Sequence, residues 1–366
     1  MPSTTTSDYK TLSLAPLELF CGKLFQSYGF TETESKEISE IVLRADLYGI
    51  ESHGIQRLIR YHQEIFSGAV DVHAKQEIIR ETAISAVIDG HQAMGQLTAA
   101  YAMRLAIEKA QKSGIGMITV RNSNHYGIAS YYALQAASAD LIGISMTNSE
   151  ALCVPTHGKR AMLGTNPIAV AAPAEPVPFS FDAASTVVPR GKLEVYKKNG
   201  KPLPAGWAID TDGRPTEDAG AVLDAIINKL GGGIAPLGGT GEVNGGHKGY
   251  GFALIVDLCA GILSGGMTSN HINLQPGHIG ICHFFTAIDY GMFGDKSEIK
   301  KRLSVFLQEL RDSPKADGAA RIYTHGEKEH EHFSNCMASG TISVNPKTVL
   351  ELKEIAKEQG LDFNAA

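Results

Sequence analysis

The sequence has few residues of the kinds that build cross-links or metal sites. Its 366 residues include five widely spaced cysteines with no C-x-x-C pair, which argues against a disulfide framework and a zinc ribbon. None of the thirteen histidines shows H-E-x-x-H or a similar ligand spacing, so no metal site is predicted. We expect buried free thiols at all five cysteine positions, Cys21, Cys153, Cys259, Cys282 and Cys336.

An excess of positive charge and long apolar runs are also missing. The formal net charge of −6 disfavours nucleic acid as a partner. No stretch of about 18 uninterrupted apolar residues occurs, and residues 1–10 lack the apolar segment of a secretory signal. With 43% hydrophobic and 20% charged residues the composition is globular, and we expect a cytoplasmic protein that does not bind membranes.

The common nucleotide-binding fingerprints are absent, but a glycine-rich run is present. Residues 231–251 read GGGIAPLGGTGEVNGGHKGYG, which fits neither G-x-G-x-x-G nor G-x-x-x-x-G-K-[ST]. The run leads through Lys248 into an apolar segment expected to be helical. Glycine lets backbone amides approach a ligand closely, and the N-terminus of a helix offers unpaired N–H groups. Together with the charge of the lysine, these features suit a phosphate. We therefore predict a phosphate site on a fold other than the Rossmann fold.

Periodicity indicates helical ends around an α/β middle. The first 75 residues are expected to be helical, with Thr31 and Glu34 forming a capping box. From about residue 83 strands and helices alternate. The expected helices are 54–66, 96–112, 127–139, 250–263, 295–311 and 346–359, the strands are 86–89, 115–120, 142–147, 168–172, 178–182 and 278–289, and 197–218 is expected to be a surface excursion.

His125, in the segment RNSNHYG, is a candidate catalytic residue. The strand–helix–strand pattern over 116–147 predicts a compact βαβ unit with His125 just beyond a strand's carboxyl end, where α/β proteins hold ligands. The start of a helix disfavours imidazolium, so we expect a neutral side chain that accepts a proton near pH 7. The position alone leaves an alternative to this catalytic role. In that alternative His125 only caps the helix or forms a hydrogen bond with a loop carbonyl.

His53, Arg57 and Tyr61 are spaced four residues apart and therefore share one face of the predicted helix 54–66. An imidazole, a phenol and a guanidinium that can grip a carboxylate with two bonds indicate a pocket for a small carboxylic acid. A solvated helix face would show the same spacing, so local chemistry leaves both interpretations open.

Several other polar residues stand at predicted turns and strand ends. Thr165 and Asn166 in GTNP either orient a ligand or only mark a turn. Asp182 in FSFDAAST ends a strand, where a carboxylate bonds ribose hydroxyls, orients a histidine or caps the next turn. For His247 and for the segment 325–327, surface solvation is the default interpretation.

Six segments stand in a fixed order along nearly the whole chain. They are RADLYGIESHGIQRLIRY (44–61), NSNHYGIASYY (122–132), GTNPIAVAAP (164–173), GWAIDTDGRPTEDA (206–219), GGTGEVNGGHKGYG (238–251) and THGEKE (324–329). Together they resemble the type-2 malate/L-lactate dehydrogenase family. That family includes malate, lactate, sulfolactate and ureidoglycolate dehydrogenases and ketogulonate and cyclic-imine reductases, which all exchange hydride with NAD or NADP.

The resemblance implies an α/β, non-Rossmann nicotinamide-binding mixed-sheet fold with a helical subdomain made from the N- and C-terminal segments. It also implies a homodimer with an active site near the subunit interface. We accordingly expect three parts. These are an N-terminal helical segment with substrate-pocket residues (1–75), an α/β cofactor-binding and catalytic core (76–294) and a C-terminal helical segment that packs with the first (295–366).

Roles for particular residues are implied by the same resemblance. His53 of the SHG motif and His125 of the NHYG motif match the family's two proton-transfer histidines, while Arg57 and Tyr61 match substrate-pocket positions. Where some members have proline and glycine, this chain has Thr324 and His325 instead. The expected cofactor-binding residues are Ser149, Thr165, Asn166, Phe181, Asp182, Ala183, Ala184, His247, Lys248, His325, Gly326 and Glu327.

These matches predict an NAD(P)-dependent oxidoreductase that moves hydride between nicotinamide and C2 of a small 2-hydroxy or 2-oxo acid. Arg57 is expected to hold the substrate carboxylate, with His125 preferred to His53 as the base. Malate/oxaloacetate is the expected substrate pair; the alternatives are L-lactate, sulfolactate, ureidoglycolate, a diketo acid and a cyclic imine. A non-catalytic nucleotide-binding protein is an alternative of another class, and NADP is the alternative to NAD.

Overall fold

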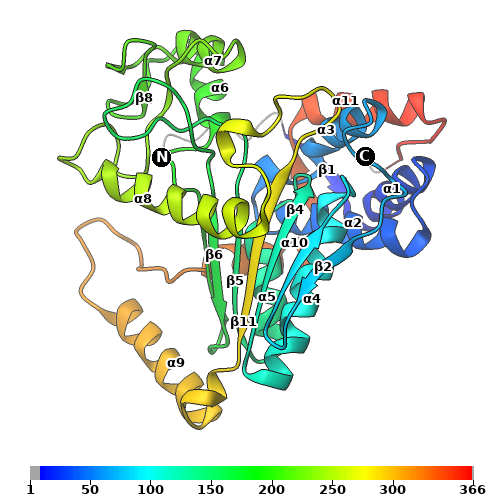
Figure 1. The fold of residues 1–366 in the computed structure, drawn as a ribbon, viewed down its shortest axis with the longest axis vertical. Coiled ribbons are helices and arrows are strands. Elements are labelled where there is room, and N and C mark those ends of the chain that lie inside the picture. The colour runs from blue at the N-terminus through cyan, green and yellow to red at the C-terminus, as the bar shows by residue number, and fades with distance from the viewer. Residues whose placement is uncertain (1–8, 365–366) are drawn as a thin grey trace.

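The computed structural model describes residues 9–364, and its centre is a seven-stranded mixed sheet (Figure 1). The strand order is β2-β3-β4-β11-β5-β6-β7, and only β3 and β4 are parallel neighbours within it. The expected mixed-sheet α/β class is confirmed. The strands are β2 (Glu77–Glu81), β3 (Ser85–Asp89), β4 (Ile115–Ser123), β5 (Ile142–Thr147), β6 (Ile168–Ala172), β7 (Phe179–Ala183) and β11 (Ile281–Ile288).

Strand β11 separates the two strands of the expected βαβ unit. β4, helix α5 (Ala129–Ser138) and β5 do follow one another, and the two strands are parallel in direction. Each pairs with β11 instead of with the other, so that His283 lies opposite Val120 on one side and Thr147 on the other. The expectation of a compact unit was wrong because a strand from much later in the chain inserts into it.

Helices α4 (Gly95–Ser113) and α5 pack against the sheet, α4 on β4 and β11 and α5 on β5 and β6. Figure 1 shows both helices beside the lower half of the sheet. Small residues allow this close packing. A Cβ atom on Gly143 would lie 2.2 Å from the backbone oxygen of Ala133 in α5, so no side chain fits there.

The two ends of the chain share a second hydrophobic core. Strand β1 (Lys10–Ser13) pairs antiparallel with β12 (Thr341–Val344), and Figure 1 shows the N-terminal helices and the last helix of the chain at the upper right. The predicted capping box of Thr31 and Glu34 is present. The helices are α1 (Leu14–Ser27), α2 (Glu32–Leu47), α3 (Leu58–Phe66), α10 (Glu327–Ser339) and α11 (Pro346–Glu358); the expected boundaries at 75 and 294 stay a prediction.

Helix α3 begins later than expected, at Leu58 instead of about residue 54. Two 3-10 turns, Glu51–His53 and Ile55–Arg57, precede it. The buried carboxylate of Asp46 accepts a 2.7 Å hydrogen bond from the backbone N–H of Ile55. A Cβ on Gly54 would lie 2.2 Å from that carboxylate, so the close approach requires glycine and interrupts the helix.

The segment between β7 and α8 forms a lobe with its own core, seen at the upper left of Figure 1. Part of it, 197–218, was expected to be a surface excursion, but Leu203 and Ala208 are buried in the core of the lobe. The helices at the two ends of that segment were not expected from the sequence. The expected helix 250–263 begins earlier and changes type at Asp257. The elements are α6 (Arg190–Lys198), α7 (Ala219–Ile227), β8 (Ala208–Ile209), β9 (Pro215–Thr216), β10 (Gly233–Ile234), α8 (Gly246–Val256) and a π-helix (Asp257–Ile262).

Helix α9 (Lys296–Asp312) extends away from the sheet at the lower left of Figure 1.

No helix within residues 9–364 combines the length and apolar character needed to cross a membrane. The cytoplasmic location and the character of residues 1–8 stay predictions, the latter because those residues lie outside the described part. The expected free thiols are confirmed for all five cysteines; four are buried and Cys259 is half-buried.

The tight contact between β5 and α5 predicts a stability effect for Gly143→Ala. The new methyl group would collide with backbone, so we expect the variant to lose about 1–3 kcal/mol of unfolding free energy, measured by denaturant titration. Gly22→Ala in α1 is the control, because no atom from outside its own turn of helix backbone lies within 4 Å of the added Cβ among the described residues, and alanine favours a helix. Equal stabilities for the two variants would contradict this packing.

Candidate active site

Two histidines and a tyrosine from distant segments form a compact cluster. The hydroxyl of Tyr61 on α3 lies 2.7 Å from Nδ1 of His125, which follows β4. The rings of His53 and His125 stack with centroids 5.5 Å apart and an interplanar angle of 27°. The structure thus brings together residues that the sequence placed in separate motifs.

Each histidine is held through Nδ1 and leaves Nε2 free. Nδ1 of His53 lies 2.8 Å from Oγ of Ser52, as Nδ1 of His125 does from the phenol of Tyr61. Within residues 9–364 neither Nε2 atom has a hydrogen-bond partner. A hydroxyl fixes each ring while its far nitrogen can exchange a proton with a ligand.

Two arginines stand beside the histidine pair. Nε of Arg57 donates a 2.5 Å hydrogen bond to the backbone oxygen of Ser52, next to His53. Nε of Arg60, one turn further along α3, donates to a carboxylate oxygen of Glu64 at 2.7 Å. Both guanidinium groups are oriented through Nε, which is the geometry that presents the two terminal nitrogens to a carboxylate.

Burial and positive charge keep both imidazoles neutral. Burial lowers the pKa of His53 to about 4, and the charges of Arg57 and Arg60 add to this effect. Burial likewise lowers the pKa of His125 well below its ordinary value, with further contributions from Arg60, His53 and Arg57. Each ring is therefore uncharged at neutral pH and keeps one nitrogen lone pair for a proton.

The neutral state of His125 was expected, but for the wrong reason. Helix α5 begins at Ala129, with Ile128 as its N-cap, so His125 precedes the first turn instead of starting it. A helix dipole acts mainly within the first turn. The low pKa of His125 follows instead from desolvation and the neighbouring cations.

A groove of about 1130 Å³ adjoins His53 and contains several of the expected cofactor residues. It is bordered by the start of α5, the end of β7 and the start of α10. Asp182 at the end of β7 accepts a 2.8 Å hydrogen bond from the backbone N–H of Ser130 in the first turn of α5. The expected residues that line the groove are His53, Thr165, Asp182, Ala183, Ala184, His325 and Gly326.

Residues at the β7 side of the groove hold the loop before α10. The ring of Phe181 meets that of His325 edge-on at 5.3 Å, and Ser180 donates a backbone hydrogen bond to the carbonyl of His325. Gly326 is the N-cap of α10 with φ 98°, and a Cβ there would lie 3.0 Å from the backbone oxygen of Pro178. Glu327 is buried and paired with Arg311, so its carboxylate supports the loop.

A hydrogen-bonded group behind the groove consists of Ser149, Thr165 and Asn166. Only Thr165 among them lines the groove. The backbone N–H of Thr165 donates to Oγ of Ser149 at 3.1 Å, and that of Ser149 donates to Oδ1 of Asn166 at 3.2 Å. The fully buried amide of Asn166 in turn donates to Asp257 at 3.0 Å. In this arrangement the side chain of Asn166 orders the wall of the groove from behind, and its role in cofactor binding stays a prediction.

The glycine-rich run does not border the groove in the single chain. His247 and Lys248 lie exposed in the first turn of α8, away from the residues that line it. Many of its glycines are required by backbone contacts; a Cβ on Gly246 would lie 2.1 Å from the oxygen of Gly239, and one on Gly249 2.4 Å from Leu237. The phosphate role of this run stays a prediction.

Sequence reasoning missed Ser52 and Arg60. Ser52 carries no signal in the sequence beyond its position next to His53. Arg60 lies three residues after Arg57, and a search for three-residue as well as four-residue spacing would have placed it on the same helix face. No group of three or more histidine, cysteine, aspartate or glutamate side chains suited to a metal occurs in the described part of the chain.

The chain is similar to known proteins along most of its length. The family model described as malate/L-lactate dehydrogenase matches residues 12–353. The chain belongs to this family. It is 46% identical to a malate dehydrogenase of Pyrococcus abyssi over 93% of each chain, and 31% identical to an NAD(+) ureidoglycolate dehydrogenase of Escherichia coli O157:H7 over 85% of this chain and 86% of the relative.

Solved structures of the family show the same fold. The malate dehydrogenase of Pyrococcus horikoshii superposes with a TM-score of 0.88 at 42% identity, covering 97% of each chain. The malate dehydrogenase of Entamoeba histolytica gives a TM-score of 0.92 at 35% identity, covering 97% of this chain and 99% of that one. The dehydrogenase class expected from the sequence is thereby confirmed, since both relatives and solved structures of this family carry it.

The depressed pKa values predict that neither active-site histidine titrates near neutrality. We expect the imidazole NMR signals of His53 and His125 to stay those of the neutral ring from pH 8 down to about 5.5, because protonation would place a charge in a desolvated, cationic site. The His53→Asn and His125→Asn variants assign the signals. A midpoint between 6 and 7, the range of an unperturbed histidine, would contradict this account.

Proposed function

We propose that this chain is an NAD(P)-dependent dehydrogenase that interconverts a small 2-hydroxy acid and its 2-oxo acid, with malate and oxaloacetate as the pair. The observation that carries the proposal is the neutral His53–His125 pair held beside two arginines. A carboxylate needs the arginines, and a hydroxyl that must lose its proton needs the neutral imidazole. The relatives from two Pyrococcus species that are named malate dehydrogenase support the choice of malate.

In the proposed mechanism Arg57 binds the carboxylate next to the reacting carbon. Its Nε bond to Ser52 fixes the guanidinium, so the terminal nitrogens can make two parallel hydrogen bonds. This contact sets the distance between the substrate hydroxyl and the histidine pair. Positioning of this kind is worth several orders of magnitude in rate.

His125 is the proposed proton acceptor during oxidation of the hydroxyl. With its Nδ1–H donating to the phenolic oxygen of Tyr61, Nε2 offers a lone pair to the substrate hydroxyl. In the reverse direction the same nitrogen returns the proton to the carbonyl oxygen. The arginine charges that keep the ring neutral also raise the acidity of the protonated ring, which favours that return.

The groove beside His53 fits a nicotinamide dinucleotide, which would supply the hydride acceptor and donor. Asp182 is proposed to accept hydrogen bonds from ribose hydroxyls. The backbone at the start of α10, including Gly326, would suit the pyrophosphate. NAD is the proposed cofactor and NADP the alternative.

A spectrophotometric screen tests the proposed reaction. Purified protein is mixed with NADH or NADPH and with oxaloacetate, pyruvate, other 2-oxo acids or a cyclic imine, and absorbance at about 340 nm is followed. We expect the highest kcat/KM with oxaloacetate. Another preferred acid would overturn the substrate, and cofactor binding without any turnover would favour a non-catalytic nucleotide-binding protein.

Substitution of the cluster tests the roles within it. We expect His125→Asn to lower kcat by about 100- to 10,000-fold, the usual contribution of a positioned acid–base group. Tyr61→Phe keeps the ring but loses the bond to Nδ1, so a smaller loss is expected. A loss of kcat only with His53→Asn would reverse the assignment of the two histidines. Circular dichroism and cofactor binding confirm that each variant is folded.

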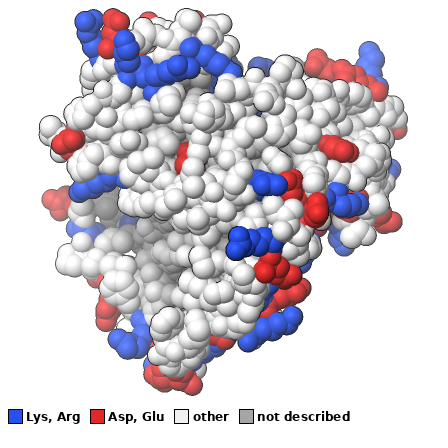
Figure 2. Space-filling model, in the orientation of Figure 1, with Lys and Arg blue, Asp and Glu red and all other residues white. Residues whose placement is uncertain are grey.

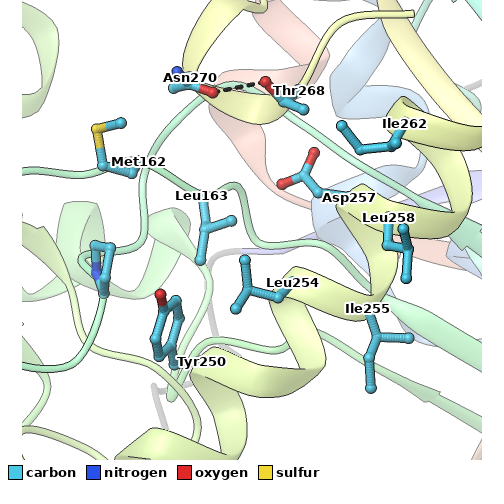
Figure 3. A pocket seen from close by; sticks show the side chains of 11 residues that line it. Met162, Leu163, Tyr250, Leu254, Ile255, Asp257, Leu258, Ile262, Thr268 and Asn270 are labelled. Atoms are coloured by element: carbon cyan, nitrogen blue, oxygen red, sulfur yellow. Dashed lines mark hydrogen bonds between the residues drawn. The ribbon is translucent and has the colours of Figure 1, made fainter. Parts of the chain in front are cut away.

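We also propose that two copies associate through the face that carries α8. Figure 2 shows a broad uncharged area on this face, and Figure 3 shows Leu254, Ile255, Leu258 and Ile262 around a groove of about 490 Å³. Apolar surface of this extent favours a partner surface over water. The exposed apolar residues of α8 and its continuation are 45% to 56% accessible: Phe252, Leu254, Ile255, Leu258, Ile262 and Leu263.

Light scattering on a size-exclusion column tests this association. We expect a dimer for the unmodified chain and a monomer for Leu258→Asp, because a carboxylate on that face would be buried without a partner. Leu350→Asp is the matched control, since Leu350 is 61% exposed but lies on α11. A monomeric unmodified chain, or equal behaviour of both variants, would overturn the proposed interface.

A further inference from the structure

Arg60 lies in the first turn of α3, three residues after Arg57, and its charge acts on His125. Residues three apart on a helix have Cβ atoms about 5–6 Å from one another. Arg60 and Tyr61 stand three and four residues after Arg57, so both are neighbours of Arg57 on one side of the helix, and Tyr61 bonds His125. The Arg60 side chain is 36% exposed, so it is partly buried but still accessible to a ligand.

The guanidinium of Arg60 is fixed but incompletely used. Its Nε donates to Glu64, whose side chain is 14% exposed, and this contact restrains the plane of the guanidinium. Within residues 9–364 neither of its two terminal nitrogens has a hydrogen-bond partner. The same holds for Arg57, which is fixed through Nε to the backbone of Ser52. The site therefore presents two oriented cations with four free terminal nitrogens.

Positive charge predominates next to the histidines, although the carboxylates of Glu194 and Glu150 also act on Arg57 and Arg60. Arg57 and Arg60 are both positive, and Glu64 is the one carboxylate that pairs with either of them among the described residues. Both arginines lower the pKa of His125, and Arg60 contributes more than Arg57. A second negative charge on the ligand would relieve this imbalance.

We infer that Arg60 binds the second carboxylate of a four-carbon dicarboxylic substrate and thereby makes the site selective for dicarboxylates over monocarboxylates. The inference rests on the proposed function, in which Arg57 holds the carboxylate beside the reacting carbon. Glu64 acts as a positioning residue, because it orients Arg60 without touching the substrate.

Selectivity between oxaloacetate and pyruvate tests this inference, because pyruvate lacks the second carboxylate. We expect Arg60→Gln to lower kcat/KM for oxaloacetate by about 10- to 100-fold, mainly through KM, the range for a lost charge-assisted hydrogen bond. The value for pyruvate should change by less than about threefold. Arg60→Lys keeps the charge without the planar fork and is expected to restore part of the loss.

Two control variants separate recognition of the second carboxylate from general effects. Arg57→Gln removes the shared carboxylate contact and should impair both substrates alike. Arg214→Gln removes an exposed arginine whose side chain is 77% accessible and should alter neither. Measurement at pH 8 keeps His125 neutral in every variant, so the ratio of the two kcat/KM values reports the contact with the second carboxylate.

The outcomes distinguish this inference from the proposed function. If the unmodified chain reduces no 2-oxo acid, the proposed function fails. If it reduces oxaloacetate but Arg60→Gln lowers both substrates equally, or neither, the role of Arg60 is overturned while the function stands. Thermal unfolding of Arg60→Gln, together with cofactor binding measured by fluorescence, shows whether the variant is folded. If it is not, Glu64→Gln is measured instead, and its ratio of kcat/KM for oxaloacetate to kcat/KM for pyruvate is expected to fall in the same direction.

Discussion

The hydrogen bond between Tyr61 and His125 is the contact on which the site depends, because it joins the two hydrophobic cores. Tyr61 belongs to the core formed by the ends of the chain, whereas the loop of His125 rests on the core of the sheet. Movement of one core against the other would change the place of the imidazole relative to Arg57. The interruption of the helix at Gly54, which lets the chain approach Asp46, sets the direction in which α3 presents these residues.

Desolvation and charge act in the same direction at the histidine pair. Burial disfavours the imidazolium form, and so do the two arginines that are suited to an anionic substrate. A dicarboxylate would reduce that positive field on binding, so the proton affinity of His125 is coupled to the charge of the ligand. The residues proposed for substrate recognition and for proton transfer therefore influence one another, and neither set works independently.

Much of the fold and part of the site could be predicted from local patterns. Alternation and helix signals located most strands of the sheet, and four-residue spacing placed Arg57 and Tyr61 together. Local patterns could not predict the insertion of β11 between β4 and β5, since pairing between distant segments leaves no periodic signal. The lobe with α6 and α7 was missed because its elements are short and its core residues are scattered among polar ones.

The sequence alone determined the family, the mixed α/β class and the candidate residues His53, Arg57, Tyr61 and His125, because their types and local spacing are written in the chain. Only the tertiary structure decided how these residues act together. It showed that His125 is neutral through burial and nearby cations, that Asn166 faces inward, and that the glycine-rich run meets its own backbone. These are properties of distance and solvent access, which depend on segments that are far apart in the chain.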